Sequence, residues 1–205
     1  MLNFEQLLLG IPALLLAISV HEFAHGYAAY RLGDPTAKHQ GRLTLNPLAH
    51  LDPIGAIMLL VFRFGWARPV PINPVYFKDR KRGTLIVSIA GPLSNFLMAW
   101  LFYNLAQVVP RWMPTWSLHL TTRLFLELNV AYNLGLAAFN LLPLPPLDGS
   151  KIVSSLLPPR WEYNYLRYAQ YGPFVLMLLL WTGVAQTILR PISITLLRLI
   201  SLLSI

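Results

Sequence analysis

The segment His21-Glu22-Phe23-Ala24-His25 combines side chains that can bind a metal ion with one that can move a proton. On a helix, positions i and i+4 share a face, so both imidazoles can reach one ion. The glutamate between them lies beside that ion without binding it, and it can take a proton from water and deliver it to a leaving amine. This spacing suits a zinc ion that has a third protein ligand and one open position.

The composition places this motif in a membrane protein. Of the 205 residues, 56% are hydrophobic and 12% are charged, whereas soluble domains have about 45–50% and about 25%. These fractions exclude a disordered chain and a collagen, and they argue against a soluble enzyme. A carboxylate at membrane depth costs at least about 2.5–3.5 kcal/mol on insertion scales, so Glu22 is a candidate for function.

Four long apolar runs can each cross a bilayer as a helix. Each holds at most one Asp, Glu, Lys or Arg, and at about 1.5 Å per residue each reaches the hydrocarbon thickness of about 30 Å. These runs are residues 6–30, 83–109, 128–147 and 168–189. The apolar segment 53–62 is too short to cross alone and predicts a re-entrant or buried helix, while the tail 191–205 either lies in the interface or completes a short span.

The segment 66–77 is the one stretch that suggests a β structure. It alternates apolar residues, but Pro69, Pro71 and Pro74 forbid a central strand. An edge hairpin or an extended loop remains. The predicted fold class is therefore an all-α polytopic membrane protein with about four to six transmembrane or re-entrant helices and a small membrane-associated β-hairpin or edge strand.

The net charge of +8 does not indicate nucleic-acid binding, because the basic residues are grouped in loops between the apolar runs. Twelve lie in segments 31–82 and 151–167, against two, Arg111 and Arg123, between the runs on the other side. Cytoplasmic loops carry such an excess. We therefore expect the lipid bilayer as a partner, no nucleic acid, and the His21–His25 motif toward the cytoplasmic side.

The residues alone leave the third metal ligand open. The chain has no cysteine, so His, Asp, Glu or another oxygen group must supply it. His39 and His50 lie in a loop that can fold back, and their roles are left open, whereas His119 is expected on the opposite face. Asp148 ends the third apolar run at a depth similar to that of the motif. A helix-end cap is the alternative explanation for that aspartate.

Three segments together resemble the site-2 proteases, the intramembrane zinc metalloproteases of peptidase family M50. His21–His25 matches the H-E-x-x-H zinc motif, Gly91–Asn95 matches G-P-x-x-N, and Asn140–Gly149 matches N-x-x-P-x-P-x-L-D-G. The resemblance covers about Ile11 to Val153 and is strongest to compact prokaryotic members without PDZ or CBS modules. We expect one intramembrane protease domain over 1–205, with its core motifs in 11–153 and C-terminal helices in 168–205.

The resemblance implies one zinc ion per chain, held by His21, His25 and Asp148, with Glu22 as general base and acid. It also implies that Asn140 and Asn95 face the site and hold the substrate backbone or the developing oxyanion, although asparagines in membranes also serve as interhelical hydrogen-bonding groups. The implied activity is hydrolysis of peptide bonds in or near transmembrane helices of membrane protein substrates, by Glu-assisted attack of zinc-bound water, in a prokaryotic cell membrane that the chain crosses several times.

Two other functions stay open at this stage. A membrane metal transporter would also bury His and Asp, but the sequence shows no internal repeat and one ligand cluster only. A catalytically inactive family member could bind helices as a chaperone or adaptor. A homo-oligomer is left open as well.

Overall fold

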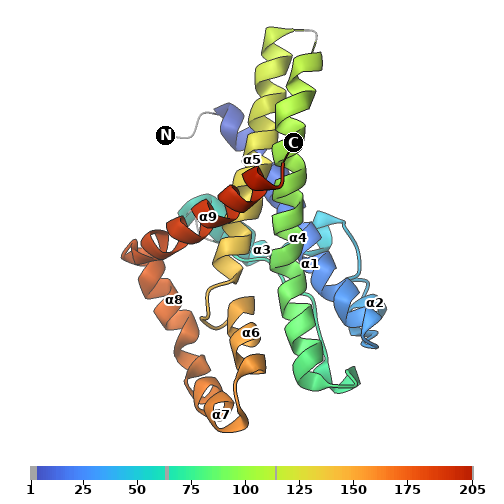
Figure 1. Cartoon of the computed structure of the whole chain (residues 1–205), viewed down its shortest axis with the longest axis vertical. Coiled ribbons are helices and arrows are strands. Elements are labelled where there is room, and N and C mark those ends of the chain that lie inside the picture. The colour runs from blue at the N-terminus through green and yellow to red at the C-terminus, as the bar shows by residue number, and fades with distance from the viewer. Residues whose placement is uncertain (1–3, 63–64, 114, 205) are drawn as a thin grey trace.

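The computed structural model describes residues 4–62, 65–113 and 115–204, and these form a helical assembly around three long helices (Figure 1). The long helices are α1 (Phe4–Arg31), α4 (Arg80–Val108) and α5 (Trp116–Asn140). The other elements are α2 (Thr36–His39), α3 (Pro53–Phe62), α6 (Asp148–Leu156), α7 (Pro159–Tyr168), α8 (Gly172–Trp181), α9 (Val184–Leu202) and the 3₁₀ turns η1 (Pro47–Ala49), η2 (Pro74–Tyr76), η3 (Val109–Trp112) and η4 (Ala169–Tyr171).

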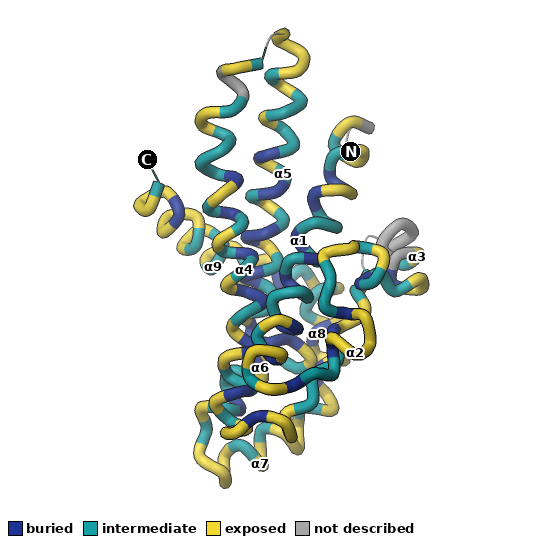
Figure 2. The backbone as a smooth tube through the Cα atoms, turned by 90° about the vertical axis from the view of Figure 1, so that its right-hand side faces the viewer, coloured by how far each residue is buried: buried dark blue, intermediate teal, exposed yellow. Residues whose placement is uncertain are grey.

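The bundle of α1, α4 and α5 is held together by small side chains. Fully or almost fully buried alanines occur on each of these helices, including Ala17, Ala99 and Ala138. Small residues let helix backbones approach closely, which is how membrane helices gain packing energy. Figure 2 shows that buried segments gather where the three helices meet, whereas the far end of the α4–α5 pair is intermediate or exposed. The middle of the bundle is therefore the most buried part of these three helices.

Three helices within the described residues are long and apolar enough to cross a membrane: Glu5–Arg31, Arg80–Val108 and Val184–Leu202. The first two confirm the predicted runs 6–30 and 83–109. The third predicted run, 128–147, is wrong at both ends, because α5 begins upstream at Trp116 and ends at Asn140. The prolines from Pro143 onward cannot continue a helix, and residues 141–147 form a turn instead.

The fourth predicted run, 168–189, is not one helix. It is divided between α8 and α9, and Gly183 between them adopts a left-handed backbone with φ of 77°, a conformation that commonly ends helices. The tail predicted for 191–205 instead continues α9 through Pro191 as far as Leu202; residue 205 lies outside the described part. In Figure 1, α9 runs obliquely across α4 and α5, where Ile200 is fully buried.

The expected β-hairpin in 66–77 is not formed. Among the residues that the structure describes, β pairing is limited to one isolated antiparallel bridge between Leu51 and Ala67. Proline removes backbone donors from the segment, and two of the donors that remain go to side chains: Val70 N–H donates to Glu22 and Asn73 N–H to Asp34. The segment is an extended strap that is fastened to α1 and its following turn. By contrast, α3 has the bounds of the short helix predicted over 53–62.

Candidate metal centre

Three side chains converge at the junction of α1 and α6. The Nε2 atoms of His21 and His25 lie 3.2 and 2.9 Å from Asp148 Oδ2, and 3.0 Å from each other. All three residues are buried. The structure thus brings together two imidazoles one helical turn apart on α1 with a carboxylate more than 120 residues later in the chain.

The proton positions on the imidazoles show what this trio can bind. His25 Nδ1 lies 2.7 Å from the carbonyl oxygen of Val87. A carbonyl only accepts, so Nδ1 carries a proton, and in the neutral imidazole Nε2 presents a lone pair. His21 Nδ1 is likewise engaged, by Asn95 Oδ1 at 2.5 Å. In the neutral imidazoles two nitrogen lone pairs and a carboxylate oxygen face one point, where a metal ion or a shared proton relieves their repulsion. This donor set is that of catalytic zinc sites.

The chain delivers Asp148 to this point through a tight turn. Asp148 begins α6 immediately after the proline-rich segment 141–147. A Cβ on Gly149 would lie 2.3 Å from the carbonyl oxygen of Leu142, so only glycine allows α6 to start so close to the end of α5. The hydroxyl of Ser150 donates to Leu147 O at 2.7 Å and secures the first turn. Packing therefore explains the glycine in the D-G pair of the sequence motif.

Gly91 allows α4 to pass directly against the two imidazoles. A Cβ at this position would lie 2.4 Å from His25 Nε2 and 2.6 Å from His21 Cε1. Any larger side chain would therefore displace a ligand atom. Gly91 is the first residue of the motif G-P-x-x-N. The sequence alone did not show that this glycine leaves room for His21 and His25.

Glu22 does not join the trio, and its carboxylate is held by the strap. Val70 N–H donates to Glu22 Oε2 at 2.8 Å, and the Val70 side chain packs against Gly26 on α1. Arg42 supports the strap from the other side, where its Nη2 donates to Arg68 O at 2.6 Å. Burial and, next, the charge of Arg68 lower the pKa of the Arg42 guanidinium, while Glu22 acts in the opposite direction.

The two predicted asparagines lie in different surroundings. Asn95 is fully buried behind His21: its Oδ1 faces His21, and its Nδ2 donates to Ala17 O and to Asn133 Oδ1. Asn140 donates to Leu136 O on its own helix at 3.1 Å. The substrate or oxyanion role of both residues stays a prediction. Val70 and Asn133 were not singled out from the sequence, although Val70 stands out as the only N–H donor in Pro69-Val70-Pro71.

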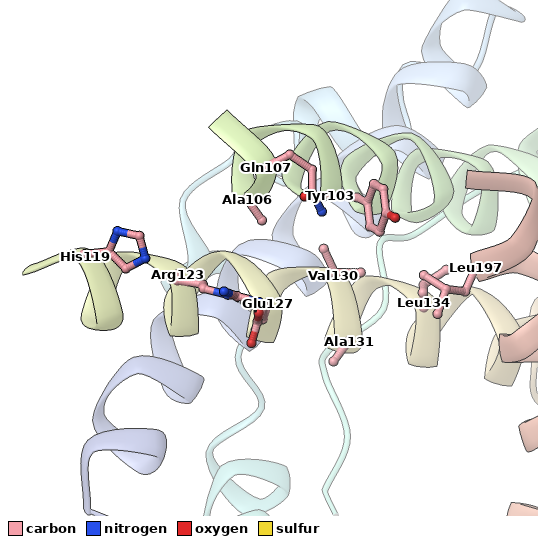
Figure 3. A pocket seen from close by; sticks show the side chains of 10 residues that line it. All are labelled: Tyr103, Ala106, Gln107, His119, Arg123, Glu127, Val130, Ala131, Leu134 and Leu197. Carbon is pink, nitrogen blue, oxygen red and sulfur yellow. Dashed lines mark hydrogen bonds and ion pairs between the residues drawn. The ribbon is translucent and has the colours of Figure 1, made fainter. Parts of the chain in front are cut away.

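The remaining histidines lie outside the trio. His50 is buried in the loop after α2, with Nε2 2.8 Å from Thr44 O. His39 is the last residue of α2. His119 stacks on Trp116 at the start of α5 and lines a pocket of about 430 Å³ between α4, α5 and α9. We call this pocket the α4–α5 groove; Figure 3 shows His119, Arg123 and Glu127 along one face of α5, opposite Gln107 of α4.

Comparison with known proteins identifies the family to which this chain belongs. The family model of peptidase family M50 matches residues 113–180, which include Asp148. The chain is 42% identical over 183 residues to the proposed zinc metalloprotease YwhC of Bacillus subtilis, covering 88% of this chain and 84% of that protein. The chain belongs to peptidase family M50. It is 32% identical to the proposed zinc metalloprotease Rip2 of Mycolicibacterium smegmatis over 85% of this chain and 67% of that protein.

A more distant relative of this M50 peptidase is the zinc metalloprotease MJ0392 of Methanocaldococcus jannaschii, which is 27% identical over 73% of this chain and 34% of that protein. No solved structure matches the chain. Membership confirms the family resemblance and makes the chain a zinc-dependent protease. The trio His21, His25 and Asp148 is the group that can hold a metal ion among the described residues.

Proposed function

We propose that this M50 peptidase is an intramembrane zinc metalloendopeptidase that hydrolyses peptide bonds in or near transmembrane helices. The observation that supports this most directly is the position of the trio. His21 lies ten residues, about 15 Å, before the end of α1, a helix long enough to cross a bilayer. A site at that depth is accessible to a helix that lies in the membrane.

Glu22 is proposed as the group that moves the proton. It lies on the same helix between the two histidines, and Val70 N–H holds one of its carboxylate oxygens. A zinc ion held by the trio supplies a Lewis acid that makes water nucleophilic near neutral pH. Glu22 takes one proton from the attacking water as the carbon–oxygen bond forms, and it delivers that proton to the peptide nitrogen as the carbon–nitrogen bond breaks.

The strap is proposed to meet the unwound substrate beside Glu22. A helical peptide bond is shielded by its own hydrogen bonds, so the substrate must become extended before it is cleaved. In an extended segment alternate residues face opposite edges, and Arg68 and Val70 direct their N–H groups to His50 O and Glu22. The opposite edge contains Pro69 and Pro71, which lack N–H groups. A substrate strand can therefore pair there only by donating its own N–H groups to strap carbonyls.

We further propose a prokaryotic cell membrane that the chain crosses several times, with the trio toward the cytoplasmic side. The support is the excess of Lys and Arg in segments 31–82 and 151–167. The substrate is then another membrane protein, reached within the bilayer.

The test is cleavage of a transmembrane helix by the purified full chain in lipid vesicles, together with zinc analysis. We expect about one zinc ion per chain, cleavage that stops with a chelator and returns with zinc, and loss of zinc in His21→Ala. Glu22→Gln is expected to retain zinc while cleavage falls by at least about 100-fold, the lower range for loss of a general acid–base group. Retained cleavage in Glu22→Gln contradicts the role of Glu22. Zinc flux across the vesicles without cleavage would support a transporter instead.

A further inference from the structure

A chain of buried asparagine amides leads from the trio into α5. Asn95, Asn133 and Asn129 are all 0% exposed. Asn95 Nδ2 donates to Asn133 Oδ1 at 2.8 Å, and Asn133 Nδ2 donates to the backbone oxygen of Asn129 at 2.9 Å. Burying polar groups among helices is costly unless hydrogen bonds compensate. Leucine would fit such a core with less cost, so the presence of these amides calls for an explanation.

The orientation of the Asn95 amide is determined by its neighbours. Ala17 O is a backbone carbonyl and can only accept, so the Asn95 atom 3.0 Å from it must be the NH₂ group. The amide oxygen of Asn95 therefore faces His21, and His21 Nδ1 must carry the proton. His21 Nε2 is left with a lone pair that points toward Asp148 and His25.

Asn133 completes this arrangement from a different helix. Its own NH₂ group faces the carbonyl of Asn129, so its oxygen must face Asn95 and accept the second hydrogen of that amide. With both amide hydrogens taken, Asn95 cannot rotate without losing two bonds. The ring of His21 is thus tied through Asn95 on α4 to Asn133 on α5.

We infer that Asn133 is a positioning residue of the metal site, which acts through Asn95 to hold His21 in its ligating tautomer and orientation. The inference deepens the proposed function and rests on it. Removal of an outer hydrogen-bond partner of a metal ligand typically lowers metal affinity about 10- to 100-fold. Asn133 contacts Asn95 and not the metal ligand itself, so we expect the smaller loss of metal affinity, about 10-fold. If Asn133 served only to hold helices together, its loss would lower folding stability and leave zinc binding unchanged.

The test compares Asn133→Leu with a matched leucine variant elsewhere in the bundle. Asn104→Leu is the control, because Asn104 is on α4, donates to Trp100 O at 2.8 Å, and lies nearer the other end of that helix from Gly91. The zinc Kd of the detergent-solubilised full chain is measured by chelator competition. The absorption spectrum of the cobalt-substituted protein reports ligand geometry. We expect Kd to rise about ten-fold and the cobalt spectrum to change in Asn133→Leu only.

Three results would overturn the inference. The first is an unchanged zinc Kd and cobalt spectrum in Asn133→Leu with a lowered melting temperature of the zinc-free protein. The second is an equal loss of zinc affinity in Asn104→Leu. The third is a His21→Ala variant that binds zinc as tightly as the parent, which rejects the proposed metal site itself. If Asn133→Leu does not fold, Asn133→Ala is measured in its place with the same expectations.

Discussion

The metal centre and the α4–α5 groove both place His and carboxylate groups in a helical bundle, but they use them in opposite ways. In the groove, Arg123 Nε donates to Glu127 Oε1 at 2.8 Å, and both side chains are more than half exposed. The charges cancel within one helix turn. In the metal centre the nearby carboxylate faces two imidazole lone pairs, and all three groups are buried.

This difference shows which feature marks a reactive site. Charged residues by themselves do not, since the groove contains them as well. What sets the metal centre apart is an excess of electron pairs directed at one point, with protons held on the far side of each imidazole by Asn95 and Val87. A cation or a proton placed between these groups offsets their repulsion, and Lys151 Nζ lies 3.4 Å from the other carboxylate oxygen of Asp148.

The largest expected effect tests that close packing. Gly91→Ala places a methyl group where His25 Nε2 lies 2.4 Å away, so we expect weaker zinc binding and cleavage about 100-fold slower, the cost of displacing a reacting group by about 1 Å. The measurement is zinc content together with the cleavage rate.

Gly135→Ala is the control for this change. A Cβ at Gly135 on α5 meets nothing within 4 Å, so we expect unchanged cleavage and a melting temperature that rises, since alanine stabilises a helix interior by about 0.5–1 kcal/mol over glycine. Normal zinc content and cleavage in Gly91→Ala would show that the approach of α4 to the imidazoles is not needed.

A smaller effect is expected at the strap. Val70→Pro removes the N–H that holds Glu22, and the loss of one hydrogen bond to a charged group, about 1.5 kcal/mol, corresponds to a cleavage rate about ten-fold lower. Zinc content should not change, because Glu22 lies outside the trio that is proposed to hold the ion. Val70→Ala retains the N–H and should cleave faster than Val70→Pro; equal rates in the two variants would argue against a role for this hydrogen bond.

The smallest effect is expected in the groove. Arg123→Gln breaks an exposed ion pair one turn apart on α5, and such pairs contribute only about 0.3–0.5 kcal/mol to stability. We expect a small change in melting temperature, with zinc Kd and cleavage within about two-fold of the parent. A larger loss of zinc binding would mean that the two regions are coupled through α5, and the contrast drawn above would not hold.

The local pattern of apolar and charged residues was sufficient to predict much of the helical structure. The uncharged runs predicted α1 and α4, and the short apolar segment predicted α3 with its observed bounds. Pattern failed where polar residues entered a helix or where one residue broke it. The pair Arg123 and Glu127 concealed the first half of α5, and Gly183 divided a run that contained no charge.

Of the two structures predicted for the strap, the extended loop formed and the hairpin did not, for a tertiary reason. Its alternating residues suggested a hairpin, but a hairpin needs a neighbouring strand to accept its donors. Here α1 and the turn after it supply Glu22 and Asp34 as acceptors instead. Side chains therefore accept the hydrogen bonds that a neighbouring strand would accept in a hairpin. Nothing in the local sequence distinguishes a hairpin from this extended segment.

The sequence by itself placed two imidazoles and the carboxylate of Glu22 on one helix, with one helical turn between the imidazoles so that both can face one ion. It could not choose among the candidates for the third ligand without a family resemblance, because helical periodicity acts only over a few residues. Tertiary structure decided that Asp148 reaches His21 and His25, that Gly91 makes room for them, and that Asn95 on α4 lies between His21 and Asn133 on α5. Those contacts depend on the packing of helices far apart in the chain.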